Sequence, residues 1–156
     1  MKIEIGPYLL DVDLEATAAR QSQQAENTCT CPYCTNFRHS VGTASDEVRA
    51  FFRKLNLDPA KPWDVWGIYN HNGETELYGG CYKLVGSILR EQDPWESTGN
   101  GAFHIKEGYE LRFDDCLFVH FEVDCRGGHR EPEEGVFWME VSWDLPWLLQ
   151  RTHAGK

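Results

Sequence analysis

The sequence has no long apolar run. No stretch of its 156 residues approaches the ~18 apolar residues of a membrane-spanning helix, so we expect no membrane span. The first residues, MKIEIGPYLLD, also lack the apolar core of a secretory signal. We therefore predict a cytoplasmic protein whose thiols stay reduced, and an exported protein with three disulfides among its six cysteines is the less favoured alternative.

Basic residues are scarce. The chain has 15 Lys+Arg against 25 Asp+Glu, and most of its net charge of −10 falls on residues 63–156. Nucleic-acid binding requires a basic surface, so this class of function is disfavoured. One hypothesis is an acidic inhibitor or immunity-type protein that masks a basic protein partner through residues 107–144. The simpler interpretation is a well-solvated surface, and the oligomeric state is not indicated.

Several motifs of catalysis are absent. The pairs Gly79-Gly80 and Gly127-Gly128 lack the helix start and the Lys-Ser/Thr of a phosphate-binding loop, and the six histidines form no His-x-x-x-His pair. An enzyme that uses a cysteine or a His/acid pair stays open, because His120 alternates with Glu122 on one predicted strand face. The strand acids that could approach one another are Glu122, Asp124, Glu140 and Asp144.

The first third of the chain predicts one hairpin and two helices. Residues 2–13 alternate around a Gly-Pro break as two short strands, and residues 14–28 are polar without an apolar stripe, as in a connector. One helix begins at Cys31-Pro32 and carries apolar residues at four-residue spacing. Ser45 caps the second helix, whose apolar face holds Val48, Phe51, Phe52 and Leu55.

The rest of the chain reads as strands. Strands are expected at 63–69, 74–85 with an extension to 90, 102–105, 110–113, 117–124 and 136–143, with a loop at 91–101. These patterns predict an α+β fold in a single domain, 1–156. The two N-terminal helices pack on a mostly antiparallel β-sheet, which is expected to be curled or sandwich-like.

The most informative stretch is TCTCPYCTNF at 28–37, which places three cysteines within six positions. A Cys-x-x-Cys at a helix start favours a thiolate and is used in dithiol redox proteins. Thioredoxin-like proteins place this motif after a buried strand, and the preceding QSQQAENT cannot form one. Redox catalysis is therefore disfavoured.

Cys29, Cys31 and Cys34 together offer three thiolates, most of the shell of a tetrahedral Zn²⁺ ion. His39 lies too far along the helix to be the fourth ligand. The other candidates for that position are Cys81, Cys116, Cys125 and His129. The alternative is a set of free thiols in which Cys34 packs under Tyr33 and Phe37.

Four stretches carry a resemblance to a known group. They are the cysteine segment 29–37, FFRKLNLDPAKPWDVW at 51–66, YGGCYKLVG at 78–86 and DLPWLL at 144–149. Together they resemble a family of small, uncharacterised bacterial cytoplasmic proteins with an N-terminal CxCxxC cluster, an LDPxKP turn and a YGG strand. The resemblance implies that the cysteine cluster is a site, supplies no catalytic residues, and weakens Cys81 as a ligand. The leading hypothesis is a non-enzymatic cytoplasmic domain of unknown role, with Cys29, Cys31 and Cys34 as a candidate zinc site.

Overall fold

The computed structural model describes residues 1–90, 93–123 and 133–149. Its helices are α1 (Leu14–Ser22), α2 (Pro32–Ser40) and α3 (Asp46–Lys54), with a 3-10 turn, η1 (Val41–Thr43). Its strands are β1 (Lys2–Ile5), β2 (Tyr8–Val12), β3 (Asp64–His71), β4 (Thr75–Arg90), β5 (Trp95–Ser97), β6 (Phe103–Ile105), β7 (Leu111–Phe113), β8 (Leu117–Glu122) and β9 (Val136–Pro146). All described strand pairs are antiparallel, so the predicted α+β class is confirmed.

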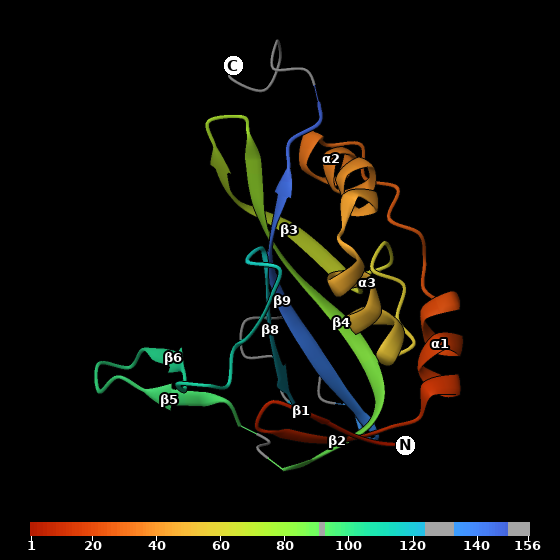
Figure 1. Cartoon of the computed structure of the whole chain (residues 1–156), viewed down its shortest axis with the longest axis vertical. Helices are drawn as coiled ribbons and strands as arrows, with labels where there is room; N and C mark the ends of the chain where they lie inside the picture. Colours follow the sequence, from red (N-terminus) through yellow and green to blue (C-terminus); the bar gives the residue numbers. More distant parts are fainter. Residues whose placement is uncertain (91–92, 124–132, 150–156) are drawn as a thin grey trace.

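The long strand β4 organises the main sheet. Seven described strands pair in it, in the order β1-β2-β4-β9-β8-β7, and β3 pairs with the first half of β4 beside this path. Strands β5 and β6 form a separate two-stranded hairpin. Figure 1 shows the three helices gathered along one side of the sheet, while the β5–β6 hairpin projects on the other side. The sheet thus has one helix-covered face and one face toward the hairpin.

The core lies between α3 and the central strands. The Ser45 hydroxyl caps α3 by accepting a hydrogen bond of 3.3 Å from the Val48 amide, as predicted. Phe52 is fully buried and stacks on Trp143 of β9, with 5.6 Å between ring centroids. Its ring also meets Tyr82 of β4 edge to face at 5.0 Å. The amphipathic pattern of 46–55 therefore identified both the helix and its buried face.

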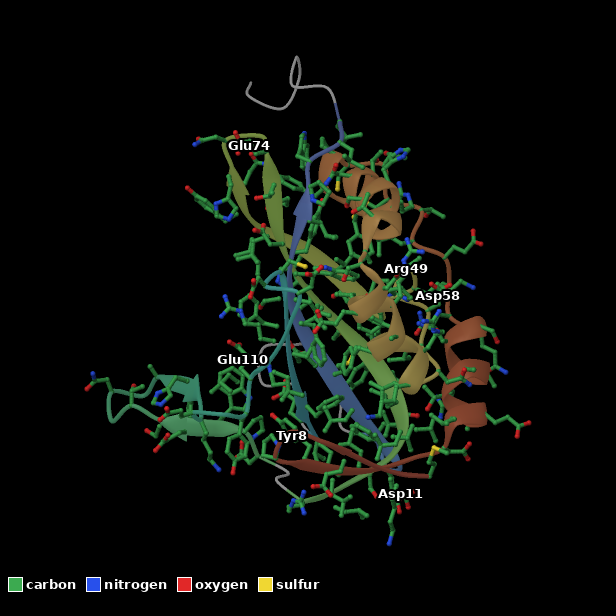
Figure 2. All side chains as sticks on the ribbon, viewed as in Figure 1. Tyr8, Asp11, Arg49, Asp58, Glu74 and Glu110 are labelled. Carbon is green, nitrogen blue, oxygen red and sulfur yellow. The ribbon has the colours of Figure 1, made fainter. Side chains whose placement is uncertain are left out.

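The prediction of a connector at 14–28 is wrong for α1. Asp13 caps this helix by accepting a hydrogen bond of 2.9 Å from the Ala16 amide. Its buried residues are Thr17 and Gln21, which are polar, so the sequence shows no apolar stripe. Gln21 bonds the backbone at Asp58, which Figure 2 labels in the loop after α3, and Thr17 accepts from the backbone of β4. Buried hydrogen bonds, together with the partly buried Leu14 side chain, dock this helix on the core.

Two further segments differ from prediction. The expected loop 91–101 contains β5. The expected strand 117–124 ends at Glu122, Val123 lies in a bend, and residues 124–132 lie outside the described part of the chain. Cys125 and His129 fall in that range. Within the described ranges, no helix is long and apolar enough to cross a membrane.

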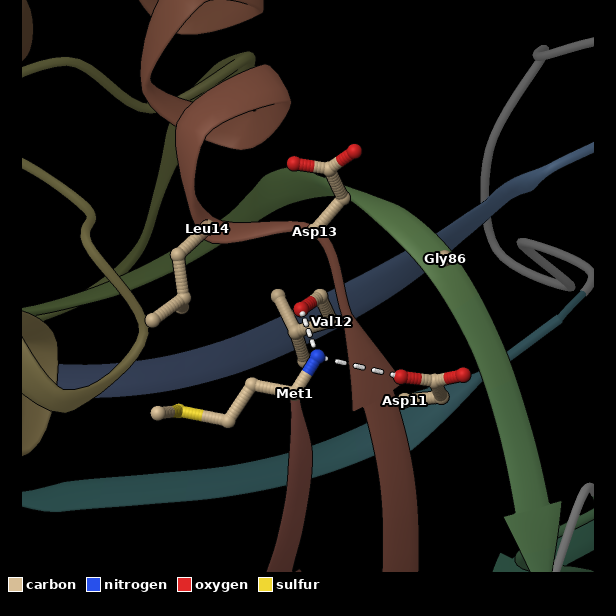
Figure 3. A pocket seen from close by; sticks show the side chains of 6 residues that line it. All are labelled: Met1, Asp11, Val12, Asp13, Leu14 and Gly86. Atoms are coloured by element: carbon tan, nitrogen blue, oxygen red, sulfur yellow. Dashed lines mark hydrogen bonds and ion pairs between the residues drawn. The ribbon is translucent and has the colours of Figure 1, made fainter.

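Strands β2 and β4 approach closely at Gly86. A Cβ on this residue would lie 1.9 Å from the Asp11 carbonyl oxygen, and its φ of +140° is one that L side chains rarely adopt. Figure 3 shows this junction, where the Met1 amine donates to Val12 O at 2.8 Å and to Asp11 Oδ1 at 3.2 Å. Glycine at position 86 is therefore required for the pairing of β2 with β4.

Candidate metal centre

Helix α2 begins at the cysteine cluster. Cys31 is its N-cap residue, with extended backbone, and Pro32 occupies the first turn as the sequence predicted. The Cys31 sulfur accepts a hydrogen bond of 3.4 Å from the Cys34 amide. This cap brings Cys34 back toward Cys31, so two of the three thiols meet through local structure alone.

The segment before the helix holds Cys29 against it. The Asn27 side-chain oxygen accepts a hydrogen bond of 3.0 Å from the Cys29 amide. Arg38, in the last turn of α2, donates to the backbone oxygens of Asn27 at 3.2 Å and of Cys29 at 2.7 Å. These contacts fold residues 27–31 over the helix, which places the Cys29 thiol beside the other two.

The three sulfur atoms lie within 4.8 Å of one another. In a tetrahedral zinc site with Zn–S bonds of about 2.3 Å, neighbouring sulfurs are about 3.8 Å apart. Cys29 is exposed, and Cys31 and Cys34 are partly exposed, so an ion can reach the cluster from solvent. The spacing and the exposure both fit a three-thiolate metal site.

The pKa values of Cys31 and Cys34 are shifted in opposite directions. The Cys34 amide, followed by the Cys29 thiol, donates to Cys31 and lowers the pKa of the Cys31 thiol. Burial, followed by the neighbouring thiols, raises the pKa of Cys34 to about 11, although a hydrogen bond with Asn27 opposes the shift. At neutral pH Cys34 is thus protonated, and a metal that binds there releases its proton.

The first turn of α2 is fixed to the sheet. The Tyr33 carbonyl accepts a hydrogen bond of 2.7 Å from the Tyr78 hydroxyl of β4. The Tyr33 ring meets Trp147 edge to face at 5.9 Å and covers Gly67 of β3, where a Cβ would come within 2.8 Å of the ring. The cysteine cluster therefore stands on a rigid support.

The predicted fourth ligands that the structure describes do not join the cluster. Among the described residues, no further His, Cys, Asp or Glu joins the three thiols, so Cys81 and Cys116 are not part of the group, and neither is His39, as expected. Cys81 is buried in β4 with Val136 and Trp138 instead. The two remaining candidates, Cys125 and His129, lie outside the described residues.

No strand leads into the Cys-x-x-Cys. Residues 23–31 contain neither helix nor strand. This confirms the expectation that the motif lacks the buried preceding strand of thioredoxin-like proteins.

The structure also forms a group that the sequence indicated only loosely. His120, Glu122 and Glu140 bring one ligand atom each to within 4.8 Å of one another. Of the other acids expected nearby, Asp144 lies 3.9 Å from His71 instead, and Asp124 is outside the described residues. The alternation along β8 was visible in the sequence, but the register that sets Glu140 opposite His120 was not.

No protein-family model, curated protein or solved structure gives a significant match to the chain. The resemblance stated above therefore stays a prediction, and the proposals below depend on the geometry of the chain itself.

Proposed function

We propose that this protein is a zinc-binding domain whose ion is held by the thiolates of Cys29, Cys31 and Cys34. The observation that carries this proposal is the mutual approach of the three sulfurs to within 4.8 Å at the start of α2. The helix dipole and the unpaired amides of the first turn favour thiolates at this position. The hydrogen bonds that lower the pKa of the Cys31 thiol favour its thiolate, the form that binds a metal.

The proposed role of the ion is structural and non-enzymatic. Zinc would join residues 27–31 to α2, a connection that otherwise depends on the exposed hydrogen bonds of Arg38 and Asn27. In the described part of the chain no His, Asp or Glu lies in this group, so a metal-bound water there would have no adjacent general base. The fourth coordination position is left to water or to a ligand from a partner.

The test is the zinc content of protein purified under reducing conditions. We expect one zinc per chain, and loss of that zinc in Cys29→Ser, Cys31→Ser and Cys34→Ser. Cys116→Ser is the matched control, because Cys116 is partly exposed like Cys31 and Cys34 but lies outside the cluster. Wild-type protein with reduced thiols that takes up no added zinc would refute the proposal.

A further inference from the structure

A second cluster of metal-ligand side chains lies on the sheet face away from the helices. His120 of β8 is directly opposite Glu140 of β9, and Glu122 is two residues along β8 on the same face. One ligand atom of each lies within 4.8 Å of the others. The three side chains thus converge from two neighbouring strands, which are more rigid supports than loops.

Two buried atoms of this group lack a hydrogen-bond partner. The side chains of His120 and Glu122 are only 12% and 3% exposed. Within the described structure, neither His120 Nε2 nor Glu122 Oε1 has a hydrogen-bond partner. The two atoms are 3.6 Å apart, which is too long for a hydrogen bond between them. Buried polar atoms are rarely left in this state, so the two atoms are well placed to bind a ligand that both can contact.

The spacing suits a shared ion. Two ligands of one tetrahedral ion, bound at about 2.1 Å, lie about 3.4 Å apart. This value is close to the 3.6 Å between His120 Nε2 and Glu122 Oε1. Two carboxylates and a neutral imidazole would also cancel the charge of a divalent ion, which lowers the cost of burying the group.

Trp95 orients one of the ligands. Its indole N–H donates a hydrogen bond of 2.6 Å to Glu122 Oε2, which leaves Oε1 as the oxygen near His120. The indole also meets the His120 ring edge to face at 5.4 Å. Hydrogen bonds of this kind hold ligating side chains in many metal sites. Because Trp95 belongs to β5, this hydrogen bond also connects the β5–β6 hairpin to β8.

The cluster opens onto a cavity of about 360 Å³. His120 and Glu140 line it, and its apolar walls come from Trp66 and Ile68 of β3 together with side chains of the hairpin. Glu110, labelled in Figure 2, is the second carboxylate of the lining beside Glu140, and the described lining residues include no lysine or arginine. A cation is therefore the charged ligand that this cavity favours.

We propose that His120, Glu122 and Glu140 form a binding site for a divalent transition-metal ion at this cavity. A mixed nitrogen and oxygen ligand set suits ions such as Zn²⁺, Mn²⁺, Fe²⁺ or Co²⁺. This site is independent of the thiolate site. Its ligands come from β8 and β9, and its donor atoms are nitrogen and oxygen instead of sulfur. Its open coordination position faces the cavity, where water or a small oxygen-donor molecule can bind.

The test uses a chain in which Cys29, Cys31 and Cys34 are replaced by Ser, so that thiolates do not compete for the probe. Co²⁺ is titrated into this chain and followed by calorimetry and by quenching of tryptophan fluorescence, because Trp95 lies against His120. We expect one Co²⁺ per chain, without thiolate-to-cobalt charge-transfer absorption. A folded triple-serine chain that binds no Co²⁺ would overturn the proposal.

Two variants and a matched control distinguish the site from ordinary surface binding. His120→Gln should weaken Co²⁺ binding at least tenfold. His104→Gln is the matched control, because His104 and Glu96 form an exposed pair at 3.4 Å on the hairpin, and it should leave the affinity unchanged. Trp95→Phe should keep the stoichiometry and weaken binding by about 10–100-fold. Equal effects of His120→Gln and His104→Gln would contradict the assignment.

Folding of each variant is checked by circular dichroism, and Glu140→Gln replaces His120→Gln if the latter does not fold. If the triple-serine chain itself does not fold, Mn²⁺ is titrated into the unmodified chain and detected by electron paramagnetic resonance. Mn²⁺ prefers oxygen and nitrogen ligands to thiolates. Its binding should be lost in Glu140→Gln, and binding that persists there would refute the site.

Discussion

The side-chain amide of Asn36 donates a hydrogen bond of 3.1 Å to the hydroxyl of Tyr78, and so joins α2 to β4 inside the core. The same amide donates to the Pro146 carbonyl at 3.1 Å and accepts from the Leu148 amide at 2.7 Å. Asn36 is fully buried, so its side-chain amide depends on these three groups for hydrogen-bond partners. Because Asn36 lies two residues after Cys34, this network also supports the cysteine cluster.

Asn36→Ala should lower the free energy of unfolding by at least about 2 kcal/mol, since it leaves buried polar groups unpaired. The measurement is urea unfolding at equilibrium. Asn100→Ala, on an exposed bend, is the control and should change stability by less than about 0.5 kcal/mol. In a double-mutant cycle, Tyr78→Phe should be coupled to Asn36→Ala; additive effects would show that the hydrogen bond contributes little.

Removal of zinc should destabilise the metal-loaded protein. Free zinc at about 100 times its Kd stabilises by about 2.7 kcal/mol, so a chelator should lower the Tm by roughly 5–10 °C. Cys34→Ser should remove this sensitivity, and Cys116→Ser should keep it. If the thiols are free instead, the chelator has no effect, and Cys34→Ser costs only about 1–3 kcal/mol, as a polar replacement of a partly buried thiol.

Gly86→Ala should be strongly destabilising, by more than about 3 kcal/mol, because the new methyl group would clash with the Asp11 backbone (Figure 3). Gly108→Ala is the comparison. Gly108 also has positive φ, +83°, but nothing lies within 4 Å of its added Cβ. Backbone strain alone should cost about 1–2 kcal/mol there. Thermal unfolding of both variants separates the clash from the strain, and similar losses would argue against a close approach at Gly86.

Glu76→Gln should stabilise the protein at neutral pH. Burial raises the pKa of Glu76 above its ordinary value of 4.5, although Asn70 donates a hydrogen bond of 3.3 Å to it. The folded state therefore holds the proton more tightly than the unfolded state. Stability falls as pH rises from about 4.5 through the folded-state pKa, and the loss persists above it.

The glutamine variant lacks this titration. Its free energy of unfolding relative to wild type should therefore increase from pH 4 to pH 7, and most of the increase should fall between the unfolded-state and folded-state pKa of Glu76. Urea unfolding across this range measures the difference. Glu74→Gln, at the exposed β3–β4 turn labelled in Figure 2, should leave the wild-type pH profile in place. A constant difference between Glu76→Gln and wild type would disprove the assignment.

Local signals in the sequence were enough to predict the cysteine cluster and most of the strands. Cys31-Pro32 marked the start of α2, and a helix start brings residues i and i+3 together without help from the rest of the chain. The turn 70–73 likewise predicted the β3–β4 hairpin, since Asn72-Gly73 is a typical hairpin-turn pair between two strand-like segments. In each case the contacting residues are close in sequence, so pattern and propensity determine the contact.

Only the tertiary structure decided α1 and the second ligand group. Helix α1 buries the polar residues Thr17 and Gln21, so its sequence has no periodic apolar stripe. Their hydrogen-bond partners lie 68 and 37 residues away along the chain. The approach of Glu140 to His120 follows from the β8–β9 register, and Trp95 reaches Glu122 from a separate hairpin. Strand register and the docking of distant segments depend on packing of the whole core, which residue spacing along the chain does not encode.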